Sequence, residues 1–536
     1  MKLQKNYSQI IDLTIILALI ITLGLIFLIF QDLVITNPIS PWHDELWNLY
    51  ASTEFFNHTQ NLWPGCNQGM CFNIMGYKFP VLSGSYHGII KSFLFLPIVM
   101  VYKIELIRIA NIVLYFSPLF YILKQKKYFG KIGCELIAVS YFFLFIPLTF
   151  EAVFDQGQFI ISKIFFLIAS VELVKELHDH NPKRIFLIIL MASLGTYEKL
   201  TNLPITISIY IVIGLILLTK DKTTITKILK YSWLIPILFI PYIVYFFHDF
   251  SFKNFERLNN LAQSQHSNYV SNLFIVYKNA FEFLFKENFT LSSFFDEKIS
   301  TTFPIASFLI ITLVFLLSIA ESFKEKNKSQ ILIVLLPFLS LLIFPAFDGL
   351  YRPWHFFAFS SLLIIPVAYL CFTNIHNHNS LKKNLTLAII CLSIADLNII
   401  FNKTYEKERR SPYSQELLKT AIDVKKQPIS NIVCLDYSVC YNLIMATDKK
   451  YKLLAEYSFS NKNDMCKNIE NLKGFDYLLI THNFPKNTSW YGQNADLFYG
   501  RSSYFNEACS INLLRLEKLE QRFNNEYSIY SHKIIK

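Results

Sequence analysis

The chain alternates long apolar runs with short polar connections. Apolar runs of about 15–20 residues recur as far as Phe401, and helices of this length cross a hydrocarbon core about 30 Å thick. The pattern predicts an α-helical polytopic membrane protein with about 11–13 transmembrane helices. A shorter stretch, Gly88–Tyr102, is either a further span or a helix along the interface. The predicted spans are Leu13–Phe30, Ile104–Leu123, Ile132–Phe150, Phe159–Val174, Ile185–Gly195, Leu203–Leu218, Tyr231–Phe247, Phe303–Ala320, Ile331–Phe344, Phe356–Phe372 and Leu385–Phe401.

The distribution of Lys and Arg gives these spans an orientation. Lys2 and Lys5 precede the first span, whereas the loops at 151–157 and 196–202 carry almost no basic residues. Short cytoplasmic loops are enriched in Lys and Arg, so one assignment satisfies the whole chain. It places the N-terminus in the cytoplasm and, with an odd number of spans, the C-terminus outside. The loops with two or more basic residues are 124–131, 175–184, 220–230, 321–330 and 374–384.

Three polar segments are large enough to fold outside the membrane: residues 31–103, 248–302 and 402–536. In the last of them, Asn431–Tyr437 and Phe475–Thr481 have the pattern of short buried strands, and Gln415–Lys426 has a helical pattern. The sequence therefore predicts a transmembrane module over residues 1–401, followed by a small extracytoplasmic α/β domain over 402–536.

Composition excludes several classes of protein. Hydrophobic residues make up 53% of the 536 residues and charged residues only 17%, against about 25% in soluble proteins. The formal charge is +11, but the basic residues gather in short loops between apolar runs. That distribution indicates membrane topology and not a nucleic-acid-binding face. The chain contains neither a P-loop nor a GxGxxG motif, so nucleotide binding lacks support and no cofactor is predicted with certainty.

Six of the nine cysteines fall in the predicted outer segments, and the other three lie in or beside apolar spans. An even number confined to one side favours disulfides in an oxidising compartment. A zinc site is the alternative, but the spacings contain no clear CxxC pair. The disulfide candidates, whose pairing the sequence leaves open, are Cys66, Cys71, Cys434, Cys440, Cys466 and Cys509.

Two adjacent carboxylates, Asp44 and Glu45, follow the first span and lie among aromatic residues. Acidic side chains near a membrane surface cost free energy if they are desolvated, so they usually serve a function or have a partner. The structural alternative is an acid pair that caps a helix, with Asp44 near the N-cap position.

Around this pair the chain resembles the GT-C glycosyltransferases, in particular the branch that contains protein O-mannosyltransferases and the lipid A aminoarabinose transferase. Those enzymes often carry Asp-Glu-x-x-Tyr-Ala in the first outer loop, and Asp44–Ala51 has the pair with two extra residues before the Tyr. The order of the matches along the chain carries the resemblance, which covers most of the membrane region by layout. Three further matches are Ser83–Ser92, Gly195–Asn202 and Tyr351–His355.

The resemblance implies transfer of a sugar from a polyprenyl-phosphate donor to an acceptor at the outer face, with inversion. Transfer needs a base for the acceptor hydroxyl and cations for the leaving phosphate. Asp44 is the expected base, and Glu45 positions the acceptor or exchanges roles with it. The expected phosphate ligands are Lys199 and Arg352, with His87, Lys91 and His355 behind them, and the expected acceptor-side acids are Glu151 and Asp155.

Each assignment has a structural alternative. Lys91 and Arg108 have the pattern of long side chains that extend to the membrane interface. Glu151 and Asp155 have the pattern of a polar loop that separates two spans. A divalent metal at the Asp-Glu pair, with His43 as a ligand, is not favoured because adjacent residues rarely converge on one ion.

Two other functions compete with sugar transfer. A multi-pass transporter or lipid flippase would show inverted repeats and charges near the bilayer midplane, whereas the charges here cluster at outer helix ends and no repeat is visible. The second competing function is that of a scaffold whose outer domain binds a partner. The acceptor is a protein, a lipid, lipid A or a glycan. The layout favours a bacterial inner membrane over the endoplasmic reticulum.

Overall fold

The computed structural model describes residues 70–218, 235–247, 269–286, 300–346, 353–373 and 379–405, apart from short gaps, and five strands between 431 and 532. Several predictions fall on other residues: the Asp44–Glu45 pair, Arg352, the helix Gln415–Lys426 and nearly all of the span Leu13–Phe30. The chain divides into two compact units, which are described separately. The first contains residues 1–35, 85–91 and 108–408, and the second contains 36–84, 92–107 and 409–536.

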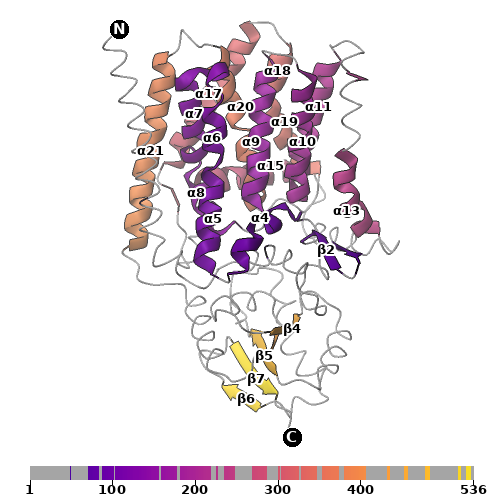
Figure 1. Ribbon diagram of the computed structural model, residues 1–536. Coiled ribbons are helices and arrows are strands. Elements are labelled where there is room, and N and C mark those ends of the chain that lie inside the picture. Colours follow the sequence, from indigo (N-terminus) through magenta and orange to yellow (C-terminus); the bar gives the residue numbers. More distant parts are fainter. Residues whose placement is uncertain are drawn as a thin grey trace. The chain divides into compact units, whose positions relative to one another are not determined.

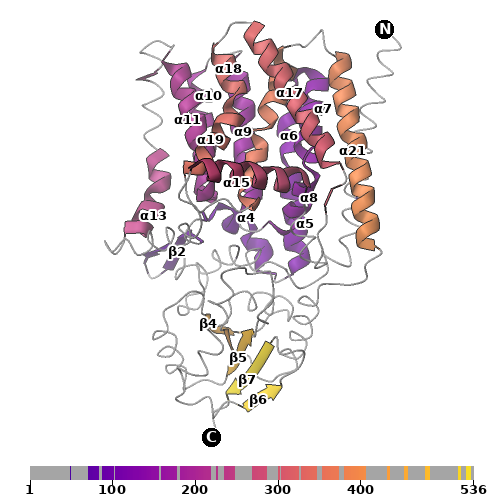
Figure 2. The same ribbon diagram turned by 180° about the vertical axis from the view of Figure 1, so that it is seen from behind.

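The first unit is a bundle of helices (Figures 1 and 2). Residues 92–107, which contain most of α4 and the start of α5, belong to the second unit. The described helices of the chain are α4 Ile90–Val99, α5 Ile104–Phe116, α6 Pro118–Leu123, α7 Lys126–Phe143, α8 Ile146–Phe154, α9 Phe159–Glu176, α10 Pro182–Glu198, α11 Leu203–Leu217, α13 Ile235–Phe247, α15 Tyr269–Phe281, α17 Pro304–Lys324, α18 Lys328–Val334, α19 Leu336–Ile343, α20 Ile364–Thr373 and α21 Asn379–Tyr405. Short 3-10 turns occur at Leu200–Asn202, Phe344–Ala346, Pro353–Phe356 and Ala358–Ser361, and a π-helical segment, Glu282–Lys286, follows α15. Most long helices run along one common direction, whereas α15 crosses the bundle (Figure 2).

The described helices confirm an integral membrane protein. Four of them are long and apolar enough to cross a membrane, or up to six if each bent pair counts as one span. The four are Ile104–Leu123, Leu200–Leu217, Pro304–Lys324 and Asn379–Ile400. All four overlap predicted spans, because a continuous apolar run fixes both the helix and its length. The predicted total of about 11–13 helices depends also on residues outside the described ones.

Three predicted spans are not single continuous helices, although each of the two bent pairs still counts as one span by length and composition. Ile132–Phe150 is divided between α7 and α8, and Ile331–Phe344 between α18 and α19, which are bent by 54°. The second helix of each pair has a proline in its first turn, Pro147 or Pro337. Proline has no N–H to donate to the preceding turn, so it starts a helix readily and interrupts one that runs through it. Phe356–Phe372 begins as 3-10 turns and becomes α-helical only in α20.

A small residue and hydrogen bonds join α9, α10 and α11. A Cβ on Gly195 of α10 would come within 2.6 Å of the Phe166 ring of α9, so this approach requires glycine. The hydroxyl of Ser162 donates to Gly195 O at 2.9 Å. The hydroxyl of Thr206 on α11 donates to Ala192 O on α10 at 2.9 Å. Lipid tails are as apolar as the helices, so close packing and interhelical hydrogen bonds stabilise such pairs.

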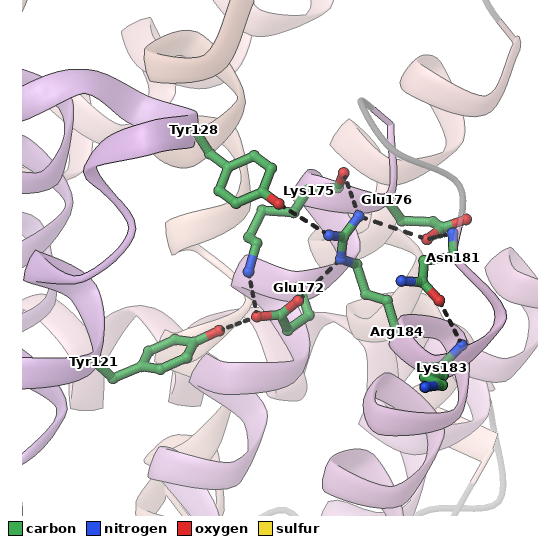
Figure 3. A network of polar contacts seen from close by, with 8 residues as sticks. All are labelled: Tyr121, Tyr128, Glu172, Lys175, Glu176, Asn181, Lys183 and Arg184. Carbon is green, nitrogen blue, oxygen red and sulfur yellow. Dashed lines mark hydrogen bonds and ion pairs between the residues drawn. The ribbon is translucent and has the colours of Figure 1, made fainter.

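A buried ionic network joins the end of α9 to the start of α10 (Figure 3). The carboxylate of Glu172 accepts hydrogen bonds from Lys175 Nζ at 2.6 Å and from Arg184 Nε at 3.1 Å. The Tyr121 hydroxyl donates to the same carboxylate at 2.7 Å. Arg184 also donates to Lys175 O at 3.0 Å and to the Tyr128 hydroxyl at 3.2 Å. The three charged side chains are at most 8% exposed, and the two ion pairs offset part of the cost of burying their charges.

In the second unit the described residues comprise most of α4, the start of α5 and two sheets. The antiparallel hairpin of β1 (Met70–Ile74) and β2 (Tyr77–Leu82) was not predicted. The other sheet has the order β4-β3-β5-β7-β6, with β3 parallel to β4 and β5, and β7 antiparallel to β5 and β6. Parallel neighbours require crossover connections, as in α/β folds. An extracytoplasmic domain over 402–536 stays a prediction. The tail strands are β3 Asn431–Cys434, β4 Lys452–Glu456, β5 Tyr477–His482, β6 Glu517–Glu520 and β7 Tyr527–His532.

Candidate functional site

Three segments that are far apart in the sequence meet in the first unit, at a place we call the junction: residues 87–91, residues 155 and 158–160, and residues 195–202. Gly88 donates its N–H to Glu198 O at 3.0 Å, and the side-chain amide of Gln158 donates to Gly88 O at 2.7 Å. His87 and Lys199 pair as an isolated antiparallel β-bridge. The start of α4, the start of α9 and the end of α10 therefore share one location.

Lys91 and Asp155 form a buried ion pair at the junction. Lys91 Nζ lies 2.5 Å from Asp155 Oδ2, and the two side chains are 1% and 0% exposed. The other oxygen, Asp155 Oδ1, accepts the Ile160 N–H at 3.1 Å, near the start of α9. The interpretation of Lys91 as a side chain that extends to the interface is therefore wrong, because its ammonium is enclosed against a carboxylate. Asp155, predicted on the acceptor side, contacts a residue predicted on the donor side.

Glu198 is a candidate that sequence reasoning missed. Its side chain is fully buried and accepts the Ile90 N–H at 2.8 Å and the Lys91 N–H at 3.2 Å. Since α4 begins at Ile90, Glu198 satisfies from another helix two N–H groups that α4 cannot satisfy itself. Glu198 lies between the predicted span that ends at Gly195 and the span Leu200–Leu217. Burial raises its pKa to about 7, against the opposing effect of the two N–H bonds and of the Lys91 charge.

The junction requires glycine at position 88. A Cβ there would lie 2.5 Å from Glu198 Oε1 and 2.7 Å from Tyr197 O. We expect Gly88→Ala to force the 87–91 segment away from α10 and to lower the free energy of unfolding by about 1–3 kcal/mol, the range for overpacking. Thermal unfolding of the purified protein measures this. Gly214→Ala is the matched control, since a Cβ on Gly214 of α11 meets nothing within 4 Å. Equal stability of the two variants would contradict the prediction.

His87 and Lys199, both predicted near the donor phosphate, contact each other. Lys199 Nζ lies 3.1 Å from His87 Nε2 and 4.3 Å from the centroid of the Phe159 ring. Both side chains are buried, at 0% and 2% exposure. An ammonium group can only donate, so a charged Lys199 donates to an Nε2 that carries no proton. In the sequence these two residues belong to separate motifs, and in the fold they contact each other.

Some of the remaining predicted residues are described by the structure, and others lie outside the described residues. Glu151 on α8 is buried, and its carbonyl accepts the Asp155 N–H at 3.0 Å, which sets the turn that presents Asp155. His355 is buried in the 3-10 turn Pro353–Phe356. Arg108 on α5 is buried with its guanidinium 5.1 Å from the centroid of the Phe154 ring, so it too does not extend to the interface. Asp44, Glu45 and Arg352 lie outside the described residues, and their roles stay predictions.

A second position missed by the sequence is Lys163, one turn after Phe159 on α9. It is 0% exposed, and its Nζ donates to the Tyr115 hydroxyl at 3.2 Å. The Nζ also lies 4.2 Å from the Tyr141 ring centroid and 5.3 Å from that of Phe357. Aromatic faces attract cations most strongly where water is excluded. Among the described residues, aromatic rings and a hydroxyl take the place of a carboxylate partner for Lys163.

The described cysteines include both bonded and free thiols. Cys71 is disulfide-bonded, and Cys134, Cys371 and Cys391 are free. Cys66 lies outside the described residues, and the pairing of the predicted set stays open. Within the described part of the chain, no three His, Cys, Asp or Glu side chains are grouped so that they could hold a metal ion.

Comparison with known proteins gives a clear result only at the level of structure. No family model and no curated protein sequence matches the chain. A crystal structure of ArnT from Cupriavidus metallidurans in the apo state superimposes with a TM-score of 0.55 and 9% identity, over 96% of this chain and 97% of that one. The crystal structure of ArnT from Cupriavidus metallidurans bound to undecaprenyl phosphate superimposes with a TM-score of 0.56 and 7% identity, over 96% of this chain and 98% of that one. This chain has the ArnT fold.

The ArnT fold confirms the predicted fold class, a polytopic helical membrane protein with an ArnT-like architecture. Identity below 10% means that the similarity concerns the path of the backbone and not particular side chains. The superposition covers at least 96% of each chain, so the similarity is not confined to one part of the fold. The resemblance inferred from short motifs at the sequence level therefore identified the right fold.

Proposed function

We propose that the chain is a membrane glycosyltransferase that moves a sugar from a polyprenyl-phosphate donor to an acceptor at the extracytoplasmic face. The observation that carries the proposal is the ArnT fold over 96% of the chain, since one of the similar structures is bound to undecaprenyl phosphate. Unrelated functions occur on one fold, so function must also be argued from the site. The buried charges of the junction supply that second argument.

The junction suits an anionic phosphate. Lys199 is held by the His87 imidazole and the Phe159 ring, and Lys91 is held by Asp155. Cations fixed in position before the reaction stabilise the charge that develops on a leaving phosphate without further reorganisation. We assign Lys199 and Lys91 to the donor phosphate, with His87 behind them. Arg352 and His355 are assigned to the same group from the sequence.

The reaction assigned to this site is a single displacement. Asp44 takes the proton of an acceptor hydroxyl while that oxygen attacks the anomeric carbon, and Glu45 orients the acceptor. The bond from the anomeric carbon to the phosphate oxygen breaks, and polyprenyl phosphate leaves with the electron pair. Attack opposite to the leaving group inverts the anomeric centre. We assign Asp155 to holding Lys91, whereas Glu151 keeps its predicted place on the acceptor side.

We propose the bacterial inner membrane as the location, with a cytoplasmic N-terminus and residues 402–536 in the periplasm. The positive residues of the loops at 124–131 and 175–184 support this orientation. The orientation places the junction, which includes the sparsely basic loop 196–202, on the side where lipid-linked sugars meet extracytoplasmic acceptors.

The test is transfer of radiolabelled sugar from a polyprenyl-phosphate donor pool in membranes that contain wild-type or Asp44→Asn protein at matched levels. We expect Asp44→Asn to lose about a hundredfold in rate, the lower range for removal of a general base, while the protein stays inserted. Glu321→Gln is the matched control, because Glu321 lies in the last turn of α17, pairs with Lys324 and is 23% exposed. Equal activity of Asp44→Asn would move the base to Glu45. No transfer by the wild type would favour a transporter or flippase.

A further inference from the structure

The start of α4 depends on an acceptor from another part of the chain. The residues before Ile90 are His87, Gly88 and Ile89, and none of them has a side-chain oxygen of the kind that usually caps a helix. Glu198, at the end of α10, supplies both bonds: one oxygen accepts the Ile90 N–H and the other accepts the Lys91 N–H. The first turn of α4 is therefore fixed by a residue separated from it by 107 or 108 positions.

Lys91 is held at two points. Its ammonium contacts Asp155, and its backbone N–H contacts Glu198. Gly88, two residues before Ile90, lies so close to Glu198 that no Cβ fits between them. Since both the origin and the end of the side chain are fixed, Lys91 loses little conformational entropy when a ligand arrives.

We propose that Glu198 is a positioning residue: by capping α4 from α10 it sets the direction in which Lys91 enters the junction, and so sets the affinity for a polyprenyl phosphate. The ligand in this statement rests on the proposed function, whereas the placement of Lys91 does not. Glu198 is not a catalytic residue, because both carboxylate oxygens are engaged by backbone N–H groups and the side chain is fully buried.

The test compares Glu198→Gln and Glu198→Asp with the wild type in the full-length protein in lipid nanodiscs. A glutamine offers one oxygen and turns an NH₂ donor toward the other N–H, so one bond at the start of α4 is lost. We expect the donor KM and the Kd for undecaprenyl phosphate to rise about tenfold in Glu198→Gln, with kcat changed less than about twofold. Glu198→Asp keeps both acceptor oxygens on a shorter side chain and should recover part of the affinity.

Glu176→Gln is the matched control. Glu176 is also a buried carboxylate that accepts a backbone N–H, that of Asn181 at 3.1 Å, but it lies at the other end of α9. We expect its KM to equal that of the wild type. If Glu198→Gln lowers the Tm as Glu176→Gln does and leaves KM and Kd unchanged, Glu198 is structural only and the proposal is overturned.

Labelling of Lys91 by an amine-reactive reagent, followed by mass spectrometry, separates this proposal from the proposed function. We expect little labelling in the wild type, because Lys91 is 1% exposed, and several-fold more in folded Glu198→Gln. If the wild type neither binds undecaprenyl phosphate nor transfers sugar, the proposed function fails, and the labelling still decides whether Glu198 positions Lys91. Unchanged labelling in a folded variant would overturn the positioning role.

Discussion

Asp155→Asn is expected to lower the free energy of unfolding by about 3–5 kcal/mol, the range for removing one partner of a buried ion pair. Asparagine has the same shape, and its oxygen can still accept the Ile160 N–H that Asp155 Oδ1 accepts at 3.1 Å. The substitution therefore removes mainly the charge that faces the Lys91 ammonium, in a place where both side chains are at most 1% exposed. Thermal or denaturant unfolding in nanodiscs measures the loss.

A second substitution separates the charge effect from a general loss of packing. Lys91→Met in the Asp155→Asn background removes the buried ammonium, so the double variant should be more stable than the single one. A surface pair provides the reference: Lys324 and Glu321 are 2.9 Å apart, but their side chains are 70% and 23% exposed. Breaking that pair should cost less than about 1 kcal/mol. A double variant no more stable than Asp155→Asn would contradict the prediction.

This pair shows why the sequence could single out residues of the junction but not their contacts. The spacing of apolar runs placed Lys91 at the start of a short helix, and α4 is indeed only 10 residues long. A Lys at the start of an apolar run usually extends to the interface, which made that interpretation reasonable. Its carboxylate partner is 64 positions away, and no local pattern reveals such a contact.

Glu198 was missed for a related reason. Lys199 was noticed because a basic residue in an outer loop departs from the positive-inside pattern. That pattern concerns basic residues only, so it does not single out an acidic residue such as Glu198 in the same loop. A signal was nevertheless present, since the segment before Ile90 lacks a capping side chain and must find an acceptor elsewhere. The hairpin of β1 and β2 was missed because its strands are short and have no clear alternation.

The membrane part was predicted better than the site because a single physical requirement determines it. Every backbone N–H and C=O in the hydrocarbon core must be bonded internally, so a long apolar run becomes a helix whatever its neighbours are. Two of the three interrupted spans are divided where proline removes a donor, at Pro147 and Pro337. The contacts of the junction instead depend on how residues 87–91 meet α9 and α10, which local sequence does not determine.

The second large effect is expected at the network of Figure 3. Glu172→Gln should lower the free energy of unfolding by about 3–5 kcal/mol, because Glu172 is the carboxylate shared by Lys175 at 2.6 Å and Arg184 at 3.1 Å. Glu176→Gln is the matched change: its carboxylate lies 4.0 Å from Arg184, and a glutamine oxygen can keep the bond from Asn181, so about 1 kcal/mol is expected. Unfolding midpoints of the two variants measure the difference. Equal losses would mean that the network acts as one diffuse cluster, whereas the predicted order would show that Glu172 alone joins the two cations.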